Sequence, residues 1–226
     1  MLNDRLGCCV VSAIGHLLGV FSANALEPLI DLTDEQIKIL YGMLSGYDEN
    51  APLDTNGNNP TDQGIDEVTA LNFWQNFGAP KGSNEIAGWM QVNAANPIEV
   101  RTAIWLFENL LYGVDLPDAY IDPAPEESGF IWDVAGPSNP DNGHAFISAA
   151  YDESGCKIDT WAMEGTMTDA ANSKYAVPAA GGALYTVFTY QSIIKATGKA
   201  QNGFAGASLV ADFNAMGGNI KNLLAV

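Results

Sequence analysis

The first eighteen residues constrain this chain more than any other stretch. Residues 3–8 have the composition of a loop, and Cys9 stands where that loop passes into an almost continuous apolar run, residues 10–18. Gly7 permits a sharp bend before the run, whose apolar side chains cover nearly every face of a helix, so we expect a helix buried in the middle of the fold. Free N–H groups in a first helical turn stabilise a thiolate and lower the pKa of a cysteine there. The stretch therefore predicts a nucleophilic cysteine on a rigid, buried helix.

A purely structural role is the alternative for these cysteines. Free cysteine is among the most buried residue types and often only fills space. Cys8 and Cys9 point about 100° apart on a helix, so at most one of them faces a cleft. With Cys156 the chain has three cysteines, whose number and spacing fit neither a disulfide framework nor a zinc site. We therefore expect free thiols, no metal and no cofactor.

Length, composition and charge limit the classes of protein to which this chain can belong. The 226 residues, 47% of them hydrophobic, suffice for one large domain with a real core. No run approaches the roughly 18 consecutive apolar residues of a membrane span, and no signal peptide is recognisable, so we expect synthesis in the cytoplasm and no membrane span. The net charge of −18 disfavours nucleic acid and anionic membranes as partners. It serves solubility or an acidic recognition surface, which would favour basic or extended substrates.

The predicted elements form a helical half followed by a sheet half. Predicted helices cover residues 9–18, 34–44, 63–76, 97–109 and 208–216, and predicted strands cover 87–92, 110–116, 144–151, 156–162 and 183–190. A long polar loop spans residues 45–63. We therefore expect a single α+β domain over residues 1–226, with a helical half at about 1–116 and an antiparallel sheet at about 128–226. A site can form between these two layers.

The chain has two histidines, and we expect different roles for them. His16 lies two turns along the helix from Cys9, too far for its ring to reach the sulfur easily, so we expect a hydrogen-bonded core residue. His144 follows Asn142-Gly143 at the start of a predicted strand. A turn there can project the ring into a cleft, where a neutral imidazole could take the proton from the cysteine.

Further residues complete a candidate acyl-transfer site. Asp159, on the next predicted strand, is expected to orient His144 through its other ring nitrogen, and Trp161 to shield the pair from water. The amide of Asn3 is expected to donate to a developing oxyanion together with the backbone N–H of Cys9. These residues supply a nucleophile, a base, an orienting group and oxyanion donors.

The same residues resemble the active-site motifs of papain-like cysteine peptidases. Residues 3–12 resemble the active-site helix of that family, with an amide side chain six residues before the cysteine and a glycine two before it, which selects Cys9 rather than Cys8. Residues 143–151 resemble the family's histidine strand, and residues 159–162 resemble its Asn-Ser-Trp-Gly motif. The resemblance implies a papain-like fold with a buried, cysteine-bearing helix packed against the sheet, and a peptide or protein substrate.

A closer resemblance is to small papain-like proteins of phages and bacteria, which begin with a Gly-Asp-Cys type of motif. It extends over residues 61–74, 132–134 and 198–199. The sequence departs from the family at Cys8, which replaces a polar residue, and at Ala162, which replaces glycine.

The register of the histidine strand is open at this point. A two-residue turn at Glu153-Ser154 would pair Ser148 with Asp159 and leave His144 one step farther out, unless a bulge or a looser turn intervenes.

From the candidate site and the resemblance together, we predict a thiol-dependent hydrolase of amide or peptide bonds. The alternative is a non-catalytic structural or binding protein, for instance a phage virion component with neighbouring virion proteins as partners.

Overall fold

The computed structural model describes residues 1–189, 193–194, 199–200, 203–218 and 220. Its elements are α1 (Cys9–Asn24), α2 (Asp34–Ser45), α3 (Glu67–Phe77), β1 (Ile86–Gln91), α4 (Pro97–Phe107), β2 (Leu110–Asp115), β3 (Phe130–Trp132), β4 (Gly143–Asp152), β5 (Gly155–Thr160), β6 (Met163–Met167), α5 (Asp169–Tyr175), β7 (Ala183–Thr189), β8 (Ile193–Ile194), β9 (Lys199–Ala200) and α6 (Gly206–Ala215). Short 3-10 turns lie at Asp118–Tyr120, Pro140–Asn142 and Pro178–Ala180. The predicted α+β class is confirmed.

Seven strands form one sheet in the order β1-β7-β2-β4-β5-β6-β3. Neighbouring strands are antiparallel except β3 and β6, which are parallel. The sheet extends beyond the predicted sheet half at about 128–226, because β1 and β2 belong to it as well. β2 lies between β7 and β4, and five of its six residues are buried, as expected for a strand covered on both faces.

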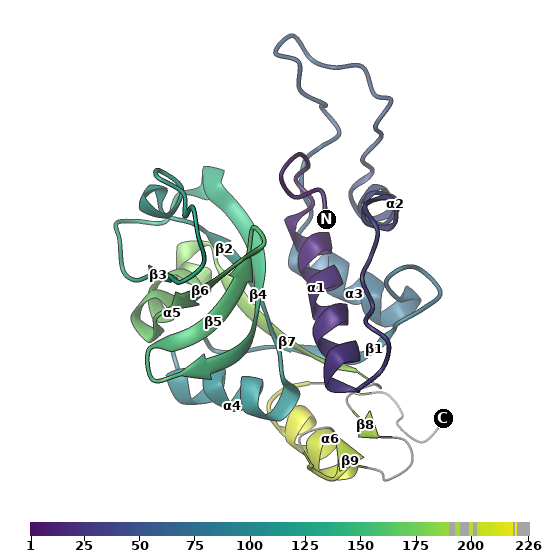
Figure 1. Ribbon diagram of the computed structural model, residues 1–226, viewed down its shortest axis with the longest axis vertical. Coiled ribbons are helices and arrows are strands. Elements are labelled where there is room, and N and C mark those ends of the chain that lie inside the picture. Colours follow the sequence, from purple (N-terminus) through teal and green to yellow (C-terminus); the bar gives the residue numbers. More distant parts are fainter. Residues whose placement is uncertain (190–192, 195–198, 201–202, 219, 221–226) are drawn as a thin grey trace.

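Alternate residues of the sheet serve two cores. Leu111, Ala145 and Ile147 face α1, whereas Tyr112 and Phe146 belong to the core that includes residues of α4 and α5. Figure 1 shows α1, α2 and α3 gathered on one side of the molecule and the curved sheet on the other. A side chain at the start of α1 therefore faces β4, which is the strand that packs most extensively against that helix.

Local capping fixes where the predicted helices begin. The capping box at Thr33 and Gln36 is present, and Gly46 ends α2 in the left-handed conformation. The helix predicted from residue 63 begins only at Glu67, because the Asp66 carboxylate accepts the Thr69 N–H at 2.9 Å and caps it there. Residues 63–66 are consequently free to line the space beside α1.

The hairpin of β5 and β6 ends the predicted strand 156–162 early. Thr160 pairs with Met163, and Trp161 and Ala162 form the turn between them with φ values of 51° and 60°. That geometry ordinarily requires residues such as Asn-Gly, so the turn, β6 and α5 escaped prediction. The predicted tail helix is confirmed as α6, and the predicted end of the last strand at Tyr190 lies outside the described residues.

A bulge resolves the open register of the β4–β5 hairpin. The pairing shifts between Ser148 and Ala150, so that Ile147, and not Ser148, pairs with Asp159. Since side chains alternate along a strand, this shift places Asp159 on the α1 face with Ala145 and puts His144 on the opposite face.

Within the described part of the chain, none of the helices combines the length and apolarity that crossing a membrane requires.

Candidate active site

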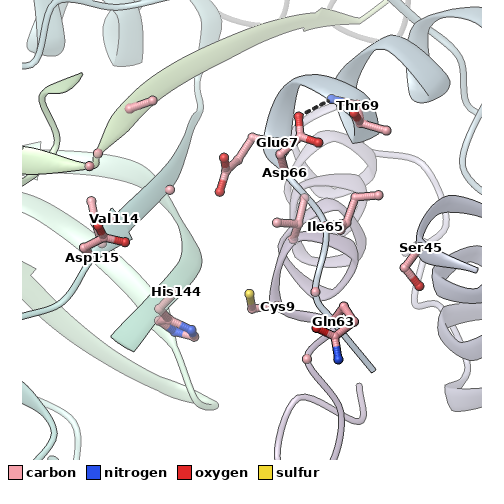
Figure 2. A pocket seen from close by; sticks show the side chains of 18 of the residues that line it. Cys9, Ser45, Gln63, Ile65, Asp66, Glu67, Thr69, Val114, Asp115 and His144 are labelled. Carbon is pink, nitrogen blue, oxygen red and sulfur yellow. Dashed lines mark hydrogen bonds between the residues drawn. The ribbon is translucent and has the colours of Figure 1, made fainter. Parts of the chain in front are cut away.

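Cys9 is the first residue of α1 and lies at the meeting point of two pockets. The larger pocket, about 760 Å³, is also lined by His144, by Glu67 and by glycines of β2 and of the segment before β7. The smaller pocket, about 290 Å³, is also lined by Asn3, His16, Asp159, Thr160 and Trp161. Figure 2 shows Cys9 and His144 projecting from opposite walls into the same space.

The bend that presents Cys9 is held by one half-buried carboxylate. Asp62 accepts the Gly7 N–H at 2.9 Å and the Tyr41 hydroxyl at 2.5 Å, which ties the segment before α1 to α2. The Ser12 hydroxyl in turn donates to the Met1 carbonyl at 2.8 Å. The segment that carries Asn3 is therefore attached to the folded body, although it stands near the start of the sequence.

The environment of the Cys9 thiol differs from the expectation of a lowered pKa. Burial raises its pKa, and the nearby Glu67 carboxylate acts in the same direction. Backbone hydrogen bonds from Ala145 and Val10 lower it, but they do not outweigh burial. The resting state at neutral pH is consequently a thiol.

His144 is a partly buried, neutral imidazole. Burial lowers its pKa from 6.5 to about 4. Its ring stacks on Trp161 with centroids 4.8 Å apart and planes at 24°, and its Nε2 lies 2.7 Å from Thr160 Oγ1. A ring held in this way can accept a proton at neutral pH, because it does not already carry one.

Asp159 lies elsewhere than its predicted role requires. Its carboxylate is 3.7 Å from His16 Nδ1, on the α1 side of the sheet, and the contact to the His144 ring is made by Thr160 instead. The physical reason is the bulge, which turns Asp159 and His144 to opposite faces. Burial raises the pKa of Asp159, whereas the charge of His16 lowers it.

Sequence reasoning missed Thr160 as the partner of His144. Thr160 is 4% exposed, and its hydroxyl faces the same side of the sheet as the histidine. Its place beside Asp159 in the recognised motif was a signal, but only the strand register decides which of two adjacent residues reaches the ring.

The other predicted residues surround Cys9 from the smaller pocket. Asn3 lines that pocket together with Cys9, and Trp161 covers one face of the His144 ring. Cys8 and Cys156 are completely buried, Cys8 beside Ser12 and Cys156 beside Asn172. Of the three thiols, that of Cys9 alone lines these two pockets.

The larger pocket contains acidic residues that the sequence analysis did not single out. Glu67, at the first position of α3, lines it together with Asp66 and Asp115. In the sequence, Asp66 and Glu67 fall inside the predicted helix 63–76 and Asp115 inside the predicted strand 110–116, and no short motif connects them. They come together because α3 and β2 both border Cys9.

Solved structures with a similar fold are cysteine proteases. Xylellain from Xylella fastidiosa has a TM-score of 0.58 at 11% identity, over 82% of this chain and 80% of its own. The Carica candamarcensis protease CMS1MS2, solved with E-64, has a TM-score of 0.51 at 13% identity, over 81% and 89%. Procathepsin L 3 of Tenebrio molitor has a TM-score of 0.52 at 11% identity, over 81% and 64%.

These similarities establish the class of fold: the chain has the papain-like fold. No protein-family model and no curated protein sequence matches the chain. The closeness to small phage and bacterial proteins therefore stays a prediction, as does the assignment of each site residue.

Proposed function

We propose that this protein is a thiol-dependent hydrolase that cleaves amide or peptide bonds through Cys9 and His144. The observation that carries the proposal is that Cys9 of α1 and His144 of β4 project from opposite walls into the same pocket. The ring of His144 is neutral at pH 7 and can act there as a base.

The first half of the proposed reaction forms an acyl-enzyme. His144 takes the proton of the Cys9 thiol as the sulfur attacks the carbonyl carbon, so the carbonyl oxygen becomes an oxyanion. The backbone N–H of Cys9 and the amide of Asn3 would donate to that oxyanion. The intermediate then collapses: the C–N bond breaks, His144 passes its proton to the leaving amine, and a thioester remains.

The second half of the proposed reaction hydrolyses the thioester and regenerates the free enzyme. Neutral His144 takes a proton from water, the resulting hydroxide attacks the thioester, and the sulfur leaves and recovers a proton as the acid product departs. Thr160 acts as a positioning residue in this scheme. If His144 Nε2–H donates to Thr160 Oγ1, Nδ1 carries the lone pair and is the atom that exchanges protons with the sulfur.

Digestion of an unfolded protein tests this proposal. Wild-type protein is incubated with a reduced, denatured protein, and new chain ends are mapped by mass spectrometry. We expect cleavage by the wild type and by Cys8→Ala, and none above background by Cys9→Ala. E-64, which the Carica candamarcensis protease binds, is expected to block the reaction. Equal cleavage by Cys9→Ala would overturn the proposal.

A peptide-binding protein without catalysis is the second candidate. Two observations favour it: the pKa of Cys9 is raised, and the acidic residue of the recognised motif faces away from His144. This candidate predicts that wild type and Cys9→Ala both bind peptides and that neither cleaves them.

A further inference from the structure

Glu67 is one of the acidic side chains that line the larger pocket, and the side chain that caps α3 is that of Asp66 rather than Glu67. Figure 2 shows it projecting from the start of α3 toward the wall formed by β2 and Asp115. Burial raises the pKa of its carboxyl, and the carboxylates of Asp66 and Asp115 raise it further, against its own backbone N–H. Among the described residues that line this pocket there is no lysine or arginine, and no ion pair to Glu67 is formed.

The pocket wall is shaped around these carboxylates. A Cβ atom at Gly113 would collide with the carboxyl group of Glu67, and a Cβ atom at Gly181 would collide with that of Asp115. Two residues without side chains therefore leave room for two acidic groups beside the thiol. A carboxyl that is held partly out of water without a counter-ion gains most from a cationic ligand that enters the same space.

We propose that Glu67 is the specificity-determining residue of the larger pocket and selects a substrate with a lysine or arginine side chain next to the bond cleaved at Cys9. This inference rests on the proposed hydrolase function. A volume of about 760 Å³ leaves room for a long side chain together with part of the peptide backbone. Asp66 stays ionised through its bond to the Thr69 N–H and adds to the negative potential that a cation meets.

Turnover of matched peptides tests the selectivity. Fluorogenic peptides that carry arginine, its neutral isostere citrulline or glutamate at each position near the cleavable bond are compared by kcat/KM. We expect wild type to prefer arginine over citrulline by about tenfold or more at one position, and Glu67→Gln to bring that ratio close to one. Glu153→Gln removes the same charge from the exposed β4–β5 turn and is expected to keep the ratio. An unchanged ratio in Glu67→Gln would overturn the proposal.

A second measurement separates this inference from the hydrolase proposal, because it needs no turnover. Cys9 is modified with methanethiosulfonates that carry an ammonium or a sulfonate group; the sulfur forms a mixed disulfide and methanesulfinate leaves. We expect the cationic reagent to react faster than the anionic one, and Glu67→Gln to reduce that preference about tenfold while Glu153→Gln keeps it. If peptides are not cleaved but this difference is found, the hydrolase proposal fails alone. If peptides are cleaved and neither measurement depends on Glu67, the selectivity proposal fails alone.

Discussion

The two pockets that meet at Cys9 treat charged groups differently. In the smaller pocket the Asp159 carboxylate lies 3.7 Å from His16, and the hydroxyl of Thr160 lies 2.7 Å from the ring of His144, which itself lines the larger pocket. In the larger pocket Glu67 has two carboxylates as neighbours and, among the described lining residues, no cationic side chain. The Asp159 and Thr160 side chains are thus paired within the protein. The Glu67 carboxylate has no cationic partner among the described lining residues and is available to a cationic ligand.

This difference separates two roles of the side chains around Cys9, namely catalysis and the selection of a ligand. Groups that are paired inside the protein hold atoms in place, which is what a base and its positioning residue require. A group left unpaired discriminates between ligands, because its interaction exists only when a suitable partner binds. We therefore expect changes at His144 and Thr160 to affect rate, and changes at Glu67 to affect selectivity.

Replacement of His144 should have the largest effect on rate. His144→Gln keeps a side chain that can bond to Thr160 but cannot take the thiol proton at neutral pH. We expect kcat to fall by about 10² to 10⁴ with little change in KM, measured on a peptide that the wild type cleaves. His16→Gln is the matched control and should change kcat far less. A similar loss in both variants would contradict the distinction between the two histidines.

The burial of His144 should also appear in the pH dependence of stability. Its pKa is 6.5 when exposed and about 4 in the folded protein, so the unfolded chain binds more protons between these values. Stability therefore falls as the pH drops from about 6.5 towards 4, by about 2 to 3 kcal/mol for this group alone. Urea unfolding at pH 7.5 and 4.5 should show a larger loss for wild type than for His144→Gln. Equal losses would mean that the ring is not buried in its neutral form.

Thr160 should matter more than Asp159 for the rate. Thr160→Val keeps the shape and removes the hydroxyl, and we expect kcat to fall about tenfold, whereas Thr160→Ser should restore most of it. Asp159→Asn should change kcat by less than about threefold, because that carboxylate faces His16. The pH profile of kcat should shift in Thr160→Val and not in Thr160→Ser. The reverse order of the Thr160 and Asp159 effects would restore the role first predicted for Asp159.

The smallest expected effect lies in the turn that borders the smaller pocket. Ala162 has a φ of 60°, a conformation that glycine adopts without the steric penalty of a Cβ atom. Ala162→Gly should therefore raise the free energy of unfolding by up to about 1 kcal/mol. Ala179→Gly, in a 3-10 turn outside the site, should lower it by about 0.5 to 1 kcal/mol. Urea unfolding measures both, and destabilisation by Ala162→Gly would contradict the left-handed turn.

Local chemistry made much of the fold predictable. The apolar run after Gly7 and the capping box at Thr33 predicted α1 and α2, and the order of the motifs predicted the papain-like fold. The partner of His144 was not predictable, because it depends on one extra residue between Ser148 and Ala150 that changes which side chain faces the ring.

The pKa of Cys9 and the acidic pocket were not predictable for a related reason. Burial of the thiol depends on how closely α1 approaches β4, and a helix N-terminus by itself indicates only the opposite trend. Glu67 and Asp115 lie 48 positions apart in the sequence and meet only because α3 and β2 border the same space.

The reaction of Cys9 with iodoacetamide at pH 6 tests the central claim most directly, with each thiol followed by peptide mapping. Because Cys9 rests as a thiol, its alkylation requires His144 to take the proton as the sulfur attacks the reagent, so His144→Gln should slow Cys9 at least about tenfold while the buried Cys8 and Cys156 react slowly in both proteins. Equal rates for Cys9 in wild type and His144→Gln would contradict the account.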